Sequence, residues 1–383
     1  MKQMQMLDLK LEYEYMKDDI DAAIKKCLKH QKWILGPEVK ELEEKIAGYL
    51  GVKHCIGVAS GTEALILSLR ALAIKTKKEE YWDKEDLIIT TPFTFTATGD
   101  TVLRSGATPL FVDIDPKTFN IDTKNIQTAL DEYGSKIKGI IPVHLYGQSC
   151  DMVEVMNIAK ENDIFVVEDC AQSFGAKFIW KQSGSLGNAG CFSFFPSKNL
   201  GGFGDGGMVS TGDDELAEII KMLLKHGGKD KYNVEHIGYN ARLDTLQAAV
   251  LLAKFKYIDE FNQKRRKVAE IYDGGLKDLE FIDTPFVINN AYHVYHQYTI
   301  KLKEVDRDDA IKLLNLKGLQ VMVYYPYLLS EMNLFQKKSK TISELKNAKR
   351  ISGMVLSLPI EPLYEENKFL YAIECITELK NII

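Results

Sequence analysis

Short apolar segments alternate with longer segments of helical period over the first two thirds of the chain. Helical spacing of apolar residues is found near residues 61–72, 96–105, 123–132 and 151–162. The apolar segments between them predict five strands, at residues 55–60, 87–91, 108–115, 137–146 and 164–170. Strands that are apolar on both faces and joined by helices are typical of a mainly parallel sheet covered on both sides.

The pattern then changes twice. Residues 189–195 and 206–211 predict two further strands, antiparallel to one another, with a glycine-rich loop between them. Beyond them we expect a long helical stretch to about residue 277, then strands at 296–302 and 320–326 and helices at 307–317 and 366–381. We therefore predict an α/β fold with a large, mainly parallel seven-stranded sheet domain at residues 1–250 and a smaller C-terminal α+β domain at residues 251–383.

Composition narrows the class of protein. The 383 residues carry a net charge of −5, which gives no reason to expect a nucleic-acid partner. No run approaches the ~20 apolar residues that a membrane helix needs. The first residues lack the apolar core of a signal peptide, so we predict a cytoplasmic protein with no membrane partner. Six scattered cysteines without CxxC spacing favour buried thiols over disulfides or a metal site. The charged stretch 74–86 is predicted to be a solvated loop.

Polar residues follow two of the predicted strands, at the sheet edge where parallel sheets bind ligands. Ser60, Gly61 and Thr62 open a helix, whose free N–H groups either form an anion site or are merely capped by a hydroxyl. Asp169 ends a fully apolar strand, where it is either a counter-ion to a cationic ligand or the cap of the next helix. Gln172 lies beside it as a hydrogen-bond donor.

Lys198 stands between a Phe-rich segment and a glycine-rich loop. Apolar surroundings disfavour the ammonium form, whose ordinary pKa is about 10.4, and make the free amine available to form a Schiff base. The alternatives are a phosphate contact or a salt bridge. A P-loop does not fit, because its lysine follows the glycines. Phe93 or Phe95, after another predicted strand, either faces a flat ligand or belongs to the core.

These signals together describe one cofactor. Pyridoxal 5′-phosphate needs a lysine for its aldehyde, an acid at its ring nitrogen, an anion site for its phosphate and a flat side chain over its ring. All four residue types are present at predicted strand ends. No G-x-G-x-x-G pattern follows the first strand, which disfavours a nicotinamide enzyme.

Five segments resemble the sugar-nucleotide aminotransferases of the DegT/DnrJ/StrS group: "SGTEAL", "FTFTAT", "EDCAQSFGA", "SFFPSKNLGGFGDGG" and "YNARLDTLQAA". The resemblance extends from residue 34 to residue 360. It implies the pyridoxal-phosphate-dependent transferase fold type I, as in aspartate aminotransferase. It also implies a homodimer whose active sites are shared between the subunits.

The resemblance assigns roles around the cofactor ring. Lys198 is similar to the lysine that forms the Schiff base and moves the proton between cofactor and substrate. Asp169 matches the acid that keeps the ring nitrogen protonated. Gln172 matches the residue near the phenolic oxygen, and Phe95 matches the aromatic residue stacked on the ring.

Further roles concern the phosphate and the substrate. Gly61 and Thr62, with Ser193, match the phosphate cradle. Asn240 matches a phosphate contact that comes from the other subunit. Arg242 is similar to a basic residue close to the substrate, and its alternative is an ion pair with an acid such as Asp244.

The chain departs from the family in the C-terminal domain. Many relatives carry a His-Tyr-Pro sequence there, whereas "VYYPYLLSEM" has Tyr324 in the place of the histidine. That region tends to touch substrate, so Tyr324 is a candidate substrate residue.

The resemblance implies transfer of an amino group from an amino acid, glutamate, to a nucleotide-linked keto sugar. The segments are most similar to members that aminate 3-keto sugars, which favours a UDP-linked 3-keto N-acetylhexosamine or its uronic acid. The product would be a diamino sugar for cell-surface polysaccharide or lipopolysaccharide. Alternatives are a dTDP-linked 3-keto-6-deoxyhexose, a 4-keto sugar nucleotide, and a catalytically silent regulator. A 3-dehydratase on this fold has histidine in place of the lysine, and Lys198 argues against it.

Overall fold

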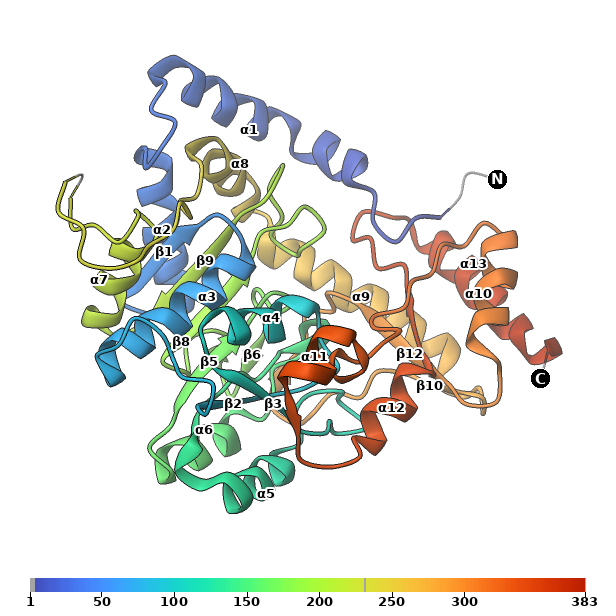
Figure 1. Cartoon of the computed structure of the whole chain (residues 1–383). Coiled ribbons are helices and arrows are strands. Elements are labelled where there is room, and N and C mark those ends of the chain that lie inside the picture. Colours follow the sequence, from blue (N-terminus) through green and yellow to red (C-terminus); the bar gives the residue numbers. More distant parts are fainter. Residues whose placement is uncertain (1–3, 231, 383) are drawn as a thin grey trace.

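An eight-stranded sheet forms the centre of the computed structural model, which describes residues 4–230 and 232–382 (Figure 1). The strands in spatial order are β1 (His54–Val58), β9 (Gly207–Thr211), β8 (Ala189–Ser193), β5 (Phe165–Asp169), β4 (Ile137–Ile140), β2 (Leu87–Thr90), β3 (Thr108–Phe111) and β13 (Lys340–Thr341). Only β9 runs antiparallel to its neighbours, β1 and β8. The predicted fold class and the predicted antiparallel pairing of the two later strands are therefore confirmed.

The sheet has one strand more than the seven predicted. The extra strand, β13, comes from the C-terminal third of the chain and pairs in parallel with β3, with Lys340 opposite Leu110. A strand of two residues has no alternation of apolar and polar positions. Its place is set by backbone hydrogen bonds to the sheet edge, so the pattern along the chain could not reveal it.

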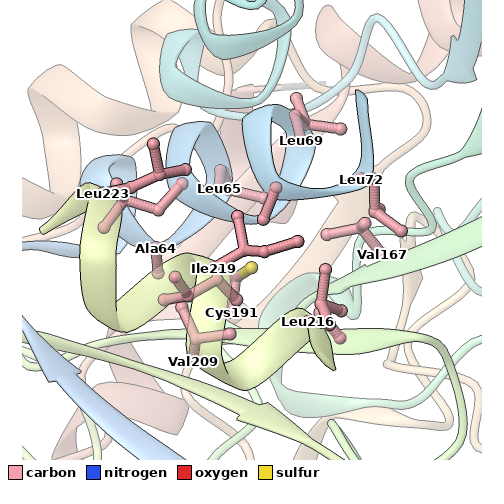
Figure 2. Close-up of a cluster of buried hydrophobic side chains, with 14 of the residues drawn as sticks. Ala64, Leu65, Leu69, Leu72, Val167, Cys191, Val209, Leu216, Ile219 and Leu223 are labelled. Carbon is pink, nitrogen blue, oxygen red and sulfur yellow. The ribbon is translucent and has the colours of Figure 1, made fainter. Parts of the chain in front are cut away.

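Helices cover both faces of the sheet because its strands are apolar on both sides. On one face, α3 (Gly61–Leu72) and α7 (Asp214–Leu223) pack on β5, β8 and β9, and Leu65, Leu69 and Leu216 are at most 2% exposed (Figure 2). The opposite face is covered by two helix pairs. These are α5 (Thr123–Tyr133) with α6 (Met152–Glu161), and α2 (Pro37–Leu50) with α8 (Thr245–Phe255). The predicted helices are confirmed, with α4 at Thr96–Arg104.

The C-terminal part builds a second core around a three-stranded antiparallel sheet. Its strands are β10 (Ile282–Asp283), β12 (Tyr298–Leu302) and β14 (Val355–Leu358), and its helices are α9 (Ile258–Leu276), α10 (Arg307–Leu316) and α13 (Glu366–Thr377). The prediction of a strand at 320–326 is wrong. Only Met322 bridges to the sheet, opposite Ser357, because the chain turns away at the tyrosine pair that follows.

Several shorter elements complete the chain. The long helix α1 (Leu9–His30) lies along the outside, and its N-terminal end lies beside the C-terminal elements (Figure 1). The remaining elements are β6 (Lys177–Phe178), β7 (Lys181–Gln182), β11 (Ala291–Tyr292), α11 (Asn333–Lys338), α12 (Lys346–Ser352), a π-helical turn at Ala73–Lys77, and 3₁₀ turns at Gly134–Lys136, Leu145–Gly147, Leu329–Glu331 and Glu378–Ile382.

The domain boundary at residue 250 stays a prediction. Many contacts cross it; for example, β13 joins the large sheet, and the Met4 N–H donates to the Gly318 carbonyl at 2.8 Å in the C-terminal core. All six cysteines are buried and free of disulfides. Among the described residues, no helix combines the length and the apolar character needed to cross a membrane.

More than half of the residues in the stretch 74–86 are exposed, as its charges predicted, but buried side chains anchor it to the fold. Trp82 is 5% exposed, and its indole Nε1 donates to the Leu69 carbonyl at 2.9 Å. Lys77 pairs with Asp86 at 2.8 Å, and Asp86 is buried too. A single tryptophan therefore anchors the segment against α3 despite the charged residues around it.

Candidate active site

The candidate residues meet at the carboxyl ends of β5 and β8 and at the start of α3. Asp169 is the last residue of β5 and Ser193 is the last residue of β8, and the two strands are neighbours in the sheet. Lys198 lies in the loop that leaves β8. The expected location at the strand ends of a parallel sheet is where the structure places them.

Lys198 is partly buried and follows Phe192 and Phe194, which are both fully buried. Its amine makes no hydrogen bond or ion pair with another residue in the described part of the chain. Burial lowers the pKa of Lys198 to about 8, while the negative charge of Asp169 acts in the opposite direction. A substantial fraction of the amine is therefore uncharged near neutral pH, as a Schiff-base lysine requires.

The loop around Lys198 is held by its neighbours. Asn199 is buried, and its Nδ2 donates to Asn262 Oδ1 on α9 at 2.7 Å, while its Oδ1 lies 3.1 Å from His296 Nδ1. A Cβ atom at Gly201 would lie 2.3 Å from the Pro196 carbonyl oxygen, so only glycine fits there. These contacts tie the lysine loop to the C-terminal part of the chain.

Asp169 is 5% exposed and accepts two hydrogen bonds. The hydroxyl of Thr98 on α4 donates to Oδ2 at 2.8 Å, and the Ala171 N–H donates to Oδ1 at 3.2 Å. Burial raises the pKa of Asp169, although these two donors and the positive charge of Lys198 act against it. A buried carboxylate held in this way is suited to face a cation, which would favour its charged form.

Gln172 is oriented by residues far apart in the chain. Its Oε1 accepts from the Tyr146 N–H at 2.7 Å, and its Nε2 donates to the Tyr325 hydroxyl at 3.0 Å. Tyr325 is followed by a proline and preceded by Tyr324, whose carbonyl accepts from the Tyr146 hydroxyl. The structure thus brings Tyr325 to Gln172, whereas Tyr324 contributes its backbone.

Phe95 and Phe93 differ in how far they are exposed to solvent. Phe93 is fully buried in a core cluster, whereas Phe95 is 61% exposed at the start of α4. The ring of Phe95 lies 6.4 Å from that of Tyr325, measured between centroids. Of the two phenylalanines, only Phe95 offers a free ring face to a flat ligand.

The start of α3 is the candidate phosphate cradle. Ser60 caps the helix, since its Oγ accepts from the Glu63 N–H at 3.1 Å, which leaves the N–H groups of Gly61 and Thr62 without an acceptor in the described chain. A Cβ atom at Gly61 would lie only 2.7 Å from the Cβ atom of Ser193. The end of β8 therefore packs directly on the helix start, and the capping and anion-site interpretations are compatible.

Arg242 and Asn240 lie next to this helix start within the same chain. Arg242 bridges to Val58, and its guanidinium donates to Asn240 Oδ1. Its Nε is buried without a hydrogen-bond partner, and no described carboxylate forms an ion pair with it, Asp244 included. A cavity of about 360 Å³ is lined by Ala59, Ser60, Asp205, Arg242, Asp244 and Gln247.

These residues fit pyridoxal phosphate. A partly uncharged lysine lies close enough to a buried carboxylate for each to shift the other's pKa. A helix start with free N–H groups lies beside a serine, and an exposed aromatic ring stands nearby. Each side chain offers the chemistry that one part of the cofactor needs.

Sequence reasoning missed three residues of this site: Thr98, Asn199 and Tyr325. Thr98 lies in the "FTFTAT" segment, in the first turn of α4, and sequence reasoning pointed there only to the two phenylalanines. Asn199 follows the lysine directly. Nothing local marked Tyr325, because its partner Gln172 is 153 residues away.

The sequence model of the DegT/DnrJ/EryC1/StrS aminotransferase family matches residues 14–377. The chain is 42% identical over 375 residues to a protein of Geobacillus stearothermophilus named pleiotropic regulatory protein, with 97% of each covered. It is 41% identical over 356 residues to a UDP-2-acetamido-2-deoxy-3-oxo-D-glucuronate aminotransferase of Pseudomonas aeruginosa, with 93% of this chain and 94% of that protein covered.

Solved structures agree with these sequence matches. Streptomyces venezuelae DesV, solved in complex with a ketimine intermediate, superposes with a TM-score of 0.93 over the whole of both chains at 33% identity. The expected fold, enzyme class and pyridoxal phosphate cofactor are confirmed at the level of the family. The chain belongs to the DegT/DnrJ/EryC1/StrS aminotransferase family.

Proposed function

We propose that this protein transfers an amino group from glutamate to the 3-keto group of a UDP-linked N-acetylhexosamine or its uronic acid. The observation that carries the transaminase chemistry is the location of Lys198, with its lowered pKa, near the buried carboxylate of Asp169. The substrate class is supported by the 41% identity to an aminotransferase named for a UDP-linked 3-oxo sugar.

The residues divide the work of the reaction. Bound pyridoxal phosphate supplies the electron sink and carries the amino group between the two substrates. Lys198 takes a proton from the reacting carbon as a free amine and returns it as an ammonium, a role worth ~10²–10⁴-fold in rate. With the cofactor bound, Asp169 would hold the ring nitrogen protonated, Phe95 would cover the ring, and Gln172 would donate to the phenolic oxygen.

Other residues of the site are proposed to bind the cofactor phosphate and the substrate. The free N–H groups at Gly61 and Thr62 and the hydroxyl of Ser193 would hold the cofactor phosphate. Arg242 lines a cavity beside this helix start and would bring a positive charge to a phosphate group of the substrate. Tyr324 is close enough to Tyr325 to line the substrate side, and its role stays a prediction.

We further propose a homodimer with shared active sites. Trp33, Ile34 and Leu35 are 42–50% exposed, and Ile34 bridges to Asp244, which lines the cavity beside Arg242. A second copy covering these apolar side chains would reach that cavity, and Asn240 would then act in the partner's site. The cytoplasmic location and a product for cell-surface polysaccharide or lipopolysaccharide are part of the same proposal.

A regulatory function is the alternative that one relative supports. The Geobacillus stearothermophilus relative at 42% identity is named a regulatory protein. A catalytically silent regulator is not expected to retain a lysine and an aspartate in this arrangement. A dTDP-linked 3-keto or a 4-keto sugar nucleotide would react through the same cofactor, so these two substrates are the alternatives to be tested.

An absorbance spectrum of the purified protein tests the proposal first. We expect a cofactor band in the wild type that bleaches with glutamate and is altered or lost in Lys198→Ala. The bleached protein is then mixed with 3-keto and 4-keto sugars linked to UDP or dTDP, and the one that restores the band identifies the substrate. A protein that stays colourless with added pyridoxal phosphate would contradict the enzyme and favour the regulator.

A further inference from the structure

A fully buried arginine lies at the far end of the helix that begins the active site. Arg70 is in the last turn of α3 and is 0% exposed. Its Nη2 donates to Glu80 Oε2 at 2.9 Å and to the Ile237 carbonyl at 3.1 Å, and its Nη1 donates to the Tyr239 hydroxyl at 2.8 Å. The guanidinium also lies 3.7 Å from the centre of the Tyr81 ring. A buried guanidinium with this many partners holds together the segments that supply those partners.

The carboxylate of Glu80 extends the same network to residues beyond the arginine. Its Oε1 lies 2.8 Å from His236 Nδ1, and its Oε2 accepts from the Ile237 N–H at 3.2 Å. Glu80 belongs to the charged stretch 74–86, which Trp82 anchors against α3. We call Arg70, Glu80, His236 and Tyr239 the clamp.

The clamp grips one end of an extended arm, residues 236–242. The other end is fixed at the start of α3, where the Ala59 N–H donates to the Ala241 carbonyl at 2.9 Å and Val58 bridges to Arg242. Between these two ends the arm pairs with the C-terminal end of α7: the Tyr239 N–H donates to the Leu223 carbonyl at 2.7 Å, and the Ala241 N–H donates to the Leu224 carbonyl at 3.2 Å. The arm is therefore held at both ends and along its middle.

Two parts of the candidate site thus share one rigid support. The first residues of α3 offer free N–H groups, and its last turn holds the arm that carries Arg242 beside them. The arm also carries Asn240, which in the proposed dimer acts in the partner's site. Arg242 has a buried Nε without a partner, so its position depends on the backbone of the arm and not on an ion pair. Loss of the clamp would leave the arm with its backbone bonds to residues 223–227 and to Ala59, so Arg242 would be positioned less firmly.

We propose that the clamp is a positioning device for Arg242 and Asn240, so that the affinity of the site for phosphate-bearing ligands depends on residues of the 74–86 stretch. The inference rests on the proposed function for its ligand, a phosphate monoester or diphosphate. The clamp residues touch neither the cofactor ring nor Lys198. Substitution of a clamp residue should therefore weaken ligand binding and leave proton transfer unaffected.

Two clamp variants and one matched control test the proposal. Glu80→Gln removes the charge that pairs with Arg70, and Tyr239→Phe removes a single hydroxyl and is the gentler change. The control, Glu235→Gln, breaks the 2.7 Å ion pair between Glu235 and Lys229 next to the clamp, without removing a contact within the clamp. The readouts are the Kd for pyridoxal phosphate, the KM and kcat with the nucleotide sugar, the Kd for inorganic phosphate and the melting temperature.

We expect Glu80→Gln to raise both the Kd for pyridoxal phosphate and the KM for the nucleotide sugar about tenfold, and Tyr239→Phe to raise both about threefold. The kcat should be nearly unchanged in both variants. The control should behave like the wild type. Combined with Arg242→Gln, the clamp variants should add little, because both changes remove the same interaction. Unchanged ligand affinity in both clamp variants, with only a lower melting temperature, would overturn the inference.

The two proposals fail differently. A wild type that binds pyridoxal phosphate but aminates no sugar nucleotide contradicts the proposed function, while the clamp is still judged from the cofactor Kd. A wild type that binds inorganic phosphate alone leaves the clamp to be judged from the phosphate Kd in the same variants. A wild type that binds neither overturns both.

Discussion

The hydroxyl of Thr98 is predicted to control the charge of Asp169. Thr98→Val keeps the shape of the side chain but removes one of the two donors to a buried carboxylate, the 2.8 Å bond to Oδ2. The Ala171 N–H then remains as the only donor, at 3.2 Å. The charged form of Asp169 loses stabilisation, and the neutral form does not.

The magnitude follows from those contacts. A hydrogen bond to a charged group contributes about 1.5–3 kcal/mol. One pKa unit corresponds to about 1.4 kcal/mol. Burial already raises the pKa of Asp169, and the lost donor should raise it by about one to two further units. Since the ionised carboxylate is the active form, the acidic limb of the pH profile of kcat/KM moves to higher pH by the same amount.

The assay is kcat/KM against pH for wild type, Thr98→Val and a control, Thr101→Val. Thr101 is buried on the same helix, and its hydroxyl donates to the Ala97 carbonyl and not to Asp169. Both variants lose a buried hydroxyl, so both lose some stability. Only Thr98→Val should shift the acidic limb. An unshifted limb in Thr98→Val, or an equal shift in Thr101→Val, would refute the reasoning.

Three further predictions follow from the same site. Because burial lowers the pKa of Lys198 to about 8 and only the free amine reacts, the rate of Schiff-base formation with added pyridoxal phosphate should rise about tenfold per pH unit below pH 8 and level off above it; a stopped-flow absorbance series showing no rise between pH 6 and 8 would contradict this. Gly61→Ala places a Cβ atom 2.7 Å from that of Ser193, so it should cost about 1–3 kcal/mol of unfolding free energy in a denaturant titration and weaken cofactor binding; unchanged binding would show that the helix start is not the cradle. Phe95→Ala should weaken cofactor binding with little change in stability, because Phe95 is 61% exposed. Phe93→Ala should lower the free energy of unfolding by about 3–5 kcal/mol in the same titration. The reverse result would show that Phe93, and not Phe95, stacks on the ring.

The sequence by itself determined the main architecture and the reacting pair. Alternating apolar segments and helical stretches predicted the parallel sheet, because hydrophobic period is a local property of the chain. A lysine between buried phenylalanines and glycines, and an aspartate at the end of an apolar strand, are unusual enough to be noticed without neighbours. Lys198 and Asp169 were therefore found from residue type and position alone.

Only the tertiary structure decided which residues support that pair. Tyr325 reaches Gln172 across 153 positions, and β13 adds to a sheet edge formed some 230 residues earlier by β3. The sequence showed the 74–86 stretch as charged and hence solvated, yet one tryptophan and the pairing of Glu80 with Arg70 bind it to α3. Contacts of this kind depend on which strand ends and helix ends the fold brings together. No pattern within a window of ten or twenty residues carries that information, because the partners are neighbours only after the chain has folded.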